Sequence, residues 1–209
     1  MTLYSLKPKF QALLRPFAAW IKHRGGTANQ VTVLAALGSI AIGALLAWQG
    51  PGSPALFLLL PVWMFVRMAL NAIDGMLARE FGDASPLGAY LNELCDQVSD
   101  AALVLPFAFI APFSPALVVI VVLLAVLSEY AGVMGAMIGA SRRYDGPAGK
   151  SDRALVFGAL GLWLGLFGAL PAWSAILLPA LICLLALTIA NRIRGGLSQA
   201  KSSDSPESR

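Results

Sequence analysis

Charged residues are scarce in this chain. Asp, Glu, Lys and Arg together make up 12% of its 209 residues, against about 25% in an ordinary soluble domain. Hydrophobic residues make up 58%, and a soluble fold of this size could not bury so much apolar surface. The composition therefore excludes a soluble globular protein and indicates a membrane protein.

Cysteine is also rare. The two cysteines, Cys95 and Cys183, both fall within strongly apolar stretches, so we expect no disulfide framework. Cys95 stands close to acidic residues, but no neighbour in the sequence would activate it as a nucleophile. We therefore assign Cys95 to packing.

Six long apolar runs dominate the chain. Each is close to the length of about 20 residues that a helix needs to cross the hydrocarbon core of a bilayer. The runs are Val31–Trp48, Ala55–Asp74, Leu87–Ile110, Ala116–Ile138, Ala154–Leu170 and Ala175–Ala190. Turn-forming residues such as Pro51 and Pro112 separate them. The sequence thus predicts an all-α, polytopic membrane protein with six transmembrane helices in one domain over residues 25–195.

The two ends of the chain differ from this domain. Residues 1–24 contain no apolar core of about 7–15 residues and no small-residue cleavage site, so no signal peptide is expected. Apolar residues there alternate with Lys and Arg at helical spacing, which predicts an amphipathic helix in the membrane interface. A basic lipid anchor and a role in substrate access both fit this helix. Residues 196–209 are polar, and we expect a disordered tail.

Basic residues are distributed unevenly between the loops. The loops around residues 50, 113 and 171 contain no Lys or Arg, whereas the alternate loops and the termini hold all but one of the 15 basic residues. The positive-inside rule then places both termini in the cytoplasm. We expect a multi-pass protein of the plasma membrane, which in a bacterium is the inner membrane. The remaining basic residue is Arg67, inside the second apolar run.

Carboxylates and amides recur where the second and third runs meet. Asn71 and Asp74 share one helical face, and Asn92, Asp96 and Asp100 share a face of the next helix. A short loop joins the two helices, so these side chains should converge at the cytoplasmic end of an antiparallel hairpin. An ionisable group at bilayer depth is costly and indicates function. Such hard oxygen ligands suit Mg²⁺ or Mn²⁺; a polar network that only joins the two helices is the alternative.

Two glycines and an arginine accompany these oxygen ligands. Gly75 and Gly88 would let a ligand approach the backbone closely. Arg79 offers the planar fork of donors that binds phosphate. Together with the oxygen cluster, they favour a phosphate-binding metal site over a purely structural network.

At these positions the sequence resembles the CDP-alcohol phosphatidyltransferase family, whose signature is Asp-x2-Asp-Gly-x2-Ala-Arg-x8-Gly-x3-Asp-x3-Asp. This chain reads Asn71-x2-Asp74-Gly75-x2-Ala78-Arg79-x8-Gly88-x3-Asn92-x3-Asp96, with every spacing kept. The resemblance covers almost the whole chain. It implies a transferase of phospholipid biosynthesis that moves a phosphatidyl-type group from a CDP-linked lipid to an alcohol and releases CMP. The expected partners are these two substrates and membrane lipid, with no nucleic acid, and a homodimer is left open.

The resemblance also implies roles for the motif residues. Asn71, Asp74, Asn92 and Asp96 are the expected ligands of Mg²⁺ or Mn²⁺, and Asp96 is in addition the expected general base for the acceptor hydroxyl. The first and third aspartates of the signature are Asn in this chain. An amide carbonyl can still coordinate the metal, but two negative charges are missing, which weakens electrostatic clamping of a pyrophosphate. A non-catalytic homologue that binds nucleotide or lipid without turnover is therefore the alternative.

Two further segments complete the predicted site. Thr27 and Asn29 open the first apolar run in a pattern that resembles the Thr-Pro-Asn-x-x-Thr of the family, and helix capping and nucleotide contact explain them equally well. The loop 141–153 is basic, and it either attracts anionic lipid or binds the acceptor, as in relatives that use a phosphorylated polyol. The predicted substrate-binding residues are thus Gly75, Ala78, Arg79, Gly88, Thr27, Asn29, Arg142, Arg143 and Arg153.

Two charged residues inside the apolar runs remain. An arginine within the membrane needs a partner, and in an antiparallel hairpin that sets Asn71 opposite Asp96, Arg67 faces Asp100. We predict an Arg67–Asp100 ion pair, which we favour over Asp100 as a direct metal ligand. Glu129, in the middle of the fourth run, has no partner that the sequence can assign.

Overall fold

Helices are the regular elements of the structure, a computed structural model that describes residues 6–203. The α-helices are α1 (Leu6–His23), α2 (Ala28–Gln49), α3 (Leu59–Glu80), α4 (Pro86–Val104), α5 (Pro115–Met134), α6 (Lys150–Phe167) and α7 (Leu177–Ser203). Short 3₁₀ segments extend four of them: η2 (Pro54–Leu58), η3 (Leu105–Phe109), η4 (Gly135–Ile138) and η5 (Ala172–Ile176). The prediction of an all-α fold is confirmed.

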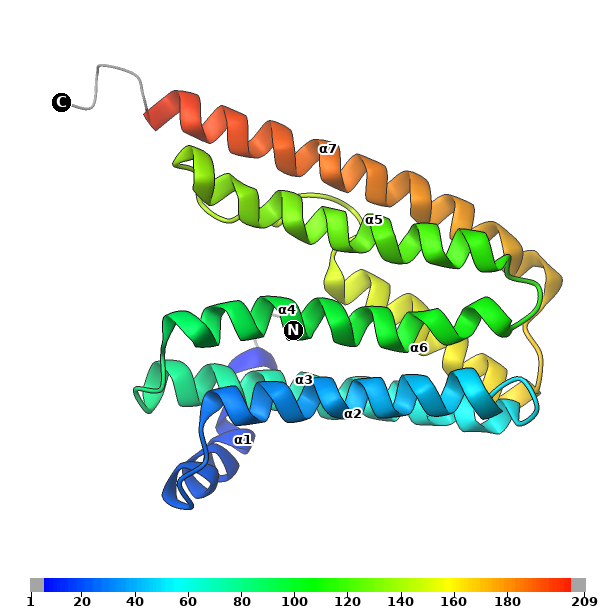
Figure 1. Cartoon of the computed structure of the whole chain (residues 1–209), viewed down its shortest axis with the longest axis horizontal. Coiled ribbons are helices and arrows are strands. Elements are labelled where there is room, and N and C mark those ends of the chain that lie inside the picture. Colours follow the sequence, from blue (N-terminus) through cyan, green and yellow to red (C-terminus); the bar gives the residue numbers. More distant parts are fainter. Residues whose placement is uncertain (1–5, 204–209) are drawn as a thin grey trace.

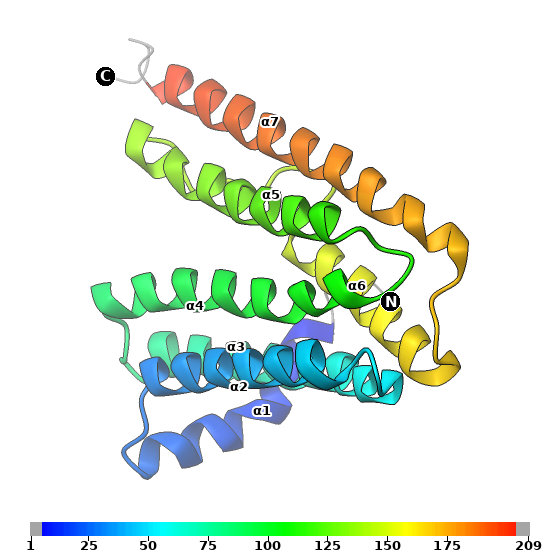
Figure 2. The same ribbon diagram turned by 45° about the vertical axis from the view of Figure 1, so that its right-hand side comes forward.

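The helices form two groups (Figures 1 and 2). In both views α2, α3 and α4 run side by side, while α5 and α7 pair along their length, and α6 lies between the groups. The ribbons of α4 and α5 diverge from the connection that joins them. The acidic motif lies on α3 and α4, at the end of the bundle where these two helices meet in the short loop 81–85.

An aromatic cluster packs the opposite end of the bundle. Phe57 and Phe107 are fully buried and their ring centroids lie 5.1 Å apart, and Phe157 lies 5.3 Å from Phe107. Such ring pairs contribute about 0.5–1.5 kcal/mol each beyond their buried area. Because these rings join η2, η3 and α6, they hold α6 against the group of α2, α3 and α4 at the end away from the polar site.

Four stretches of the described chain are long and apolar enough to cross a membrane: Ala28–Gln49, Pro54–Glu80, Pro115–Ile138 and Ala172–Lys201. The other two long helices carry more charge, α4 with Glu93, Asp96 and Asp100 and α6 with Lys150, Asp152 and Arg153. Large apolar side chains are exposed on the outer faces, for example Trp48 (80%) and Leu123 (57%). This pattern is typical of a multi-pass membrane protein whose outer surface contacts lipid.

The terminal helices differ in part from the sequence expectation. In α1, Leu13, Phe17 and Trp20 are exposed, while an Arg15–Glu80 ion pair of 3.0 Å joins the helix to α3. In contrast to the disorder expected from residue 196, α7 remains helical to Ser203. The side chain of Gln199 accounts for this, since it accepts hydrogen bonds from the Ser141 hydroxyl (2.9 Å) and from Arg143. Residues 1–5 and 204–209 of the two predicted terminal segments lie outside the described residues.

Candidate active site

The facing register of α3 and α4 is the one that the sequence predicts. Asn71 Nδ2 donates to Asp96 Oδ1 at 3.2 Å, and one helical turn along the hairpin Arg67 Nη1 donates to Asp100 Oδ1 at 2.5 Å. The predicted Arg67–Asp100 pair is therefore confirmed. Arg67 Nη2 also reaches Asp96 Oδ1 at 3.0 Å, and the Lys150 ammonium contacts the second carboxylate oxygen of Asp96. Asp96 is thus surrounded by an amide and two cations.

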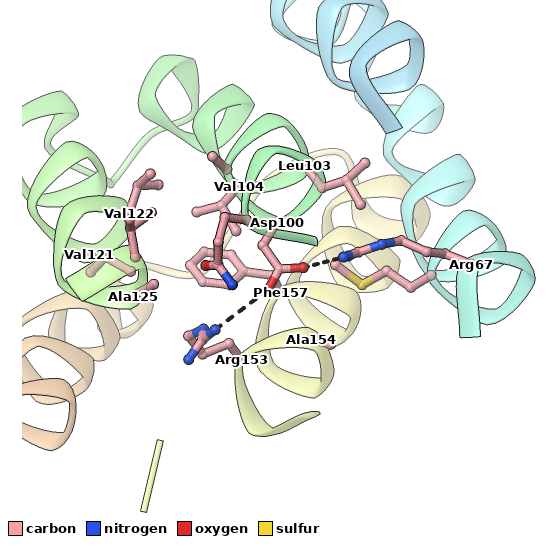
Figure 3. A pocket seen from close by; sticks show the side chains of 14 residues that line it. Arg67, Asp100, Leu103, Val104, Val121, Val122, Ala125, Arg153, Ala154 and Phe157 are labelled. Atoms are coloured by element: carbon pink, nitrogen blue, oxygen red, sulfur yellow. Dashed lines mark hydrogen bonds and ion pairs between the residues drawn. The ribbon is translucent and has the colours of Figure 1, made fainter. Parts of the chain in front are cut away.

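Asp100 is held from two sides (Figure 3). Besides the bond from Arg67, its Oδ2 lies 3.5 Å from Nη2 of Arg153 on α6. The pocket that these three residues line is otherwise mainly apolar, with side chains such as Val121 and Phe157. Both carboxylate oxygens of Asp100 are therefore engaged by guanidinium groups, as the ion-pair interpretation requires.

A residue of α2 positions Asp74. The Asp74 side chain is buried (6% exposed), and its Oδ2 accepts a hydrogen bond of 2.7 Å from the Thr32 hydroxyl. Hydrogen bonds to a carboxylate are stronger than neutral ones and fix its orientation. Thr32 has no role in the sequence prediction, although it closes the Thr27–Thr32 pattern; its contact with Asp74 requires the packing of α2 on α3, which that local pattern does not encode.

Most of the residues that we predict to bind the CDP-linked lipid line one cavity of about 260 Å³, which we call the hairpin cavity. Its lining includes Asn29, Thr32, Asp74, Gly75, Ala78, Arg79, Asp83, Ser85, Gly88 and Asn92. Thr27 is not among the residues that line it. Instead Thr27 caps α2, where its hydroxyl accepts a hydrogen bond of 3.3 Å from the Gln30 amide.

The two glycines of the motif make room for neighbouring side chains. A Cβ on Gly75 would lie 2.6 Å from Nη2 of Arg79, and a Cβ on Gly88 would lie 2.7 Å from Oδ1 of Asn29. Arg79 and Asn29 themselves line the hairpin cavity. The glycines thus shape the cavity by allowing these two side chains to lie against the helices.

A second, larger cavity of about 450 Å³ lies between α4, α5, α6, α7 and the loop that follows η4; we call it the loop cavity. Its polar and charged side chains are Asn92, Asp96, Glu129, Arg142, Tyr144, Lys150, Ser151, Asp152 and Arg192. Asn92 lines both cavities, whereas Asp74 lines the hairpin cavity and Asp96 the loop cavity. The motif therefore stands at the boundary between the two spaces.

Only one of the three predicted basic loop residues, Arg142, lines the loop cavity. Arg143 turns away, because its guanidinium binds Asp145 (2.8 Å) and Gln199 (2.9 Å); the hydrogen bond from Arg143 lowers the pKa of Asp145. Arg153 does not line the loop cavity and is buried, at 4% exposure. Lys150 and Arg192 line the cavity instead. The sequence could not single these two out, because only the packing of α6 and α7 brings them to the motif.

The oxygen donors at the motif are few. Among residues 6–203, no group of three or more His, Cys, Asp or Glu side chains is arranged to hold a metal ion. The donor set that remains comprises the carboxylates of Asp74 and Asp96 and the amides of Asn71 and Asn92, with Asn71 in contact with Asp96.

The family model described as CDP-alcohol phosphatidyltransferase matches residues 26–191, which include every residue that lines the two cavities except Arg192. The chain belongs to this family. It is therefore a membrane transferase, and the resemblance seen in the sequence is confirmed.

Individual relatives agree with this assignment. Inner membrane protein YnbA of Escherichia coli is 45% identical over 94% of this chain and 97% of that protein. The phosphatidylinositol phosphate synthase of Streptomyces avermitilis is 36% identical, over 47% of this chain and 38% of that protein.

Crystal structures of Mycobacterium tuberculosis phosphatidylinositol phosphate synthase share the fold of this transferase. The complex with manganese and citrate matches with a TM-score of 0.75 at 20% identity, over 92% of each chain. The structure with CDP-DAG bound matches with a TM-score of 0.72 at 20% identity, over 90% of this chain and 94% of that one.

Proposed function

We propose that this transferase moves a phosphatidyl-type (substituted phosphate) group from a CDP-linked lipid to an alcohol acceptor, with release of CMP, in phospholipid biosynthesis. The observation that carries the proposal is the position of Asn92, which lines both cavities, between Asp74 in one and Asp96 in the other. A donor phosphate in the hairpin cavity and an acceptor hydroxyl in the loop cavity would meet at this turn of α4. The names of the relatives, phosphatidylinositol phosphate synthases, support this reaction class.

The hairpin cavity suits the CDP group. Arg79 presents a planar fork for the pyrophosphate, next to Gly75 and Ala78 of the motif, and Asn29 and Gly88 close the opposite side. Thr27 contributes by fixing the start of α2 rather than by lining the cavity. The roles of Gly75, Ala78, Arg79, Asn29 and Gly88 are carried over from the family and fit the positions of these residues in the cavity.

Asp96 is the proposed general base. It lines the loop cavity, where its carboxylate would take the proton of the acceptor hydroxyl. The acceptor oxygen then attacks the lipid-linked phosphorus, and CMP leaves with the electrons of the broken P–O bond. Lys150 and Arg67 hold the carboxylate in place from either side.

A divalent cation, Mg²⁺ or Mn²⁺, is the proposed cofactor. Asn71, Asp74, Asn92 and Asp96 carry hard oxygen donors of the kind that these ions prefer, and the Asp74 carboxylate is buried at the hairpin cavity with no cation paired to it among the described residues. The residues present therefore fit a divalent cation. When bound, the metal would supply electrostatic stabilisation to the phosphates of the donor.

The wall of the loop cavity favours an acceptor that carries its own phosphate. Arg142, Lys150 and Arg192 all line it. Among the described residues, Arg142 Nε is one of two buried side-chain nitrogens or oxygens without a hydrogen-bond partner, and a phosphate oxygen would satisfy it. Arg143 and Arg153, which we expected to bind the acceptor, would act indirectly by holding the loop and the wall.

We further propose that all six long helices cross the plasma membrane with both termini in the cytoplasm. Asp96 and Asp100 of α4 then pair with Lys150 and Arg153 of α6 at the polar site rather than facing lipid. α1 would lie in the interface, with Leu13, Phe17 and Trp20 against the membrane.

Direct assay of transfer tests the proposed function. The purified protein would be incubated with radiolabelled CDP-diacylglycerol and Mg²⁺ or Mn²⁺, together with glycerol, inositol and the monophosphate ester of each. We expect a new labelled lipid and release of CMP with at least one phosphorylated acceptor. Absence of CMP release with every acceptor and either metal would instead favour a protein that binds without turnover, an alternative to which the family comparison gives no support.

A further inference from the structure

Glu129 is a buried carboxylate that the proposed reaction does not use. It lies on α5 and is 5% exposed. Three guanidinium groups surround it: Arg153 Nη2 at 3.2 Å, Arg192 Nη1 at 3.2 Å and Arg142 Nη2 at 3.6 Å. These arginines come from α6, from α7 and from the loop that follows η4. One carboxylate thus joins three separate elements at the loop cavity.

Two of the three arginines are also fixed to the main chain. Arg192 donates to the Ser128 carbonyl (2.5 Å) and to the Asp145 carbonyl (3.4 Å), and Arg153 donates to the Ala148 carbonyl (3.0 Å). Both side chains are almost completely buried, at 2% and 4% exposure. Without Glu129, Arg192 would lose the carboxylate that it contacts, while Arg153 would keep Asp100. Removing one partner of a buried ion pair leaves an uncompensated charge, so Glu129 fixes this wall.

Arg142 is held more loosely than the other two. Its side chain is 31% exposed, its guanidinium is shared between Glu129 and Glu93 of α4, and its contact with Glu129 is the longest of the three. Holding an arginine side chain in one rotamer costs conformational entropy. A fixed anion that offsets this cost keeps the guanidinium at one side of a cavity. Of its two carboxylate partners, Glu129 is the buried one, whereas the side chain of Glu93 is 29% exposed.

We propose that Glu129 is a positioning residue for the acceptor: it sets Arg142 and Arg192 in the wall of the loop cavity, so that the anionic group of the acceptor binds at a fixed place relative to Asp96. The inference rests on the proposed function of that cavity. Glu129 does not line the hairpin cavity, so its effect is confined to the acceptor. A purely structural role would lower stability or the amount of active enzyme without changing affinity for one substrate.

The test compares Glu129→Gln and Glu129→Asp with Glu80→Gln, a matched control whose carboxylate pairs with Arg15 on the other side of α3. Steady-state kinetics would use CDP-diacylglycerol and the acceptor that the wild type uses best. For Glu129→Gln we expect the KM of the acceptor to rise at least about tenfold with the KM of the donor unchanged. Glu129→Asp keeps the charge but withdraws the carboxylate by one methylene group, so we expect a smaller but still measurable rise in the acceptor KM. Glu80→Gln should match the wild type. An unchanged acceptor KM with a lower kcat or melting temperature would overturn the inference.

Calorimetric titration with glycerol 3-phosphate separates this inference from the reaction itself. We expect the wild type to bind this probe and Glu129→Gln to bind it at least about tenfold more weakly. Binding that depends on Glu129 in a protein without turnover would refute the proposed reaction but not the positioning role. If Glu129→Gln does not fold in detergent, the comparison uses Glu129→Asp. Weaker binding of glycerol 3-phosphate by Glu129→Asp than by the wild type supports the positioning role. Equal affinity of the two proteins, or no binding by the wild type, overturns it.

Discussion

The guanidinium of Arg67 joins two carboxylates of α4: its Nη1 lies 2.5 Å from Asp100 and its Nη2 lies 3.0 Å from Asp96. Asp100 lies among packed helices, whereas Asp96 is the proposed general base. Asp100 continues the chain of charges to Arg153, which contacts Glu129. The orientation of the proposed base is therefore linked, through successive ion pairs, to the far wall of the loop cavity.

Asp96→Asn should abolish most transfer and leave the protein folded. Loss of a general base typically lowers the rate by about 10²–10⁴-fold. The initial rate of CMP release is the measurement, with the melting temperature in detergent as a check on folding. Glu80→Gln, which also replaces a carboxylate by its amide but lines neither cavity, is the control. A rate for Asp96→Asn within about threefold of wild type would remove Asp96 from the mechanism.

Restoring the two missing carboxylates should strengthen metal binding. The double variant Asn71→Asp/Asn92→Asp adds two negative charges beside Asp74 and Asp96, and the attraction for Mg²⁺ or Mn²⁺ rises with the charge of the ligands. Titration with Mn²⁺, followed by its electron paramagnetic resonance signal, gives the affinity of each protein. Equal or weaker affinity in the double variant would show that these asparagines do not face the metal.

Breaking the Arg67–Asp100 pair on either side should destabilise the protein. Arg67→Met and Asp100→Leu each strand a buried charge, which costs about 3–5 kcal/mol in soluble proteins. The double variant should recover part of the loss. Recovery stays incomplete because Asp96 and Arg153 each still lose one partner. Thermal melts of all four proteins form the mutant cycle, and additive losses would separate the two residues energetically.

Thr32→Val should weaken the metal site without unfolding the protein. The change keeps the shape of the side chain but removes the hydroxyl that donates to Asp74 at 2.7 Å, and a hydrogen bond to a charged group contributes about 1.5–3 kcal/mol. We expect the affinity for Mn²⁺ to fall by about tenfold or more. Thr32→Ser retains the hydroxyl and is the control. Equal Mn²⁺ affinity in Thr32→Val and wild type would mean that this bond does not orient a metal ligand.

Local periodicity predicts one part of this site well. Once Asn71 is set opposite Asp96, helical spacing in an antiparallel hairpin places Arg67 opposite Asp100. The all-helical fold follows from composition, because a helix satisfies the hydrogen-bonding groups of its own backbone within each apolar run.

Contacts between distant elements are what the sequence does not show. The partners of Glu129 lie on α6, on α7 and in the loop after η4, and no spacing rule relates these segments to residue 129. Arg143 and Arg153 have the same charge as Lys150 and Arg192, so composition cannot tell which of them reach the cavity. The position of Gln199 likewise extends α7 beyond the polar boundary that composition predicts.

The single side chain of Asn92 between the two cavities has a consequence for the order of events. Two substrates held in separate spaces can be present together, and the acceptor can reach the phosphorus without a covalent enzyme intermediate. Double-reciprocal plots at several acceptor concentrations should then intersect rather than run parallel. One direct displacement also inverts the configuration at a phosphorus made chiral by isotopic oxygen or sulfur, whereas two successive displacements would retain it.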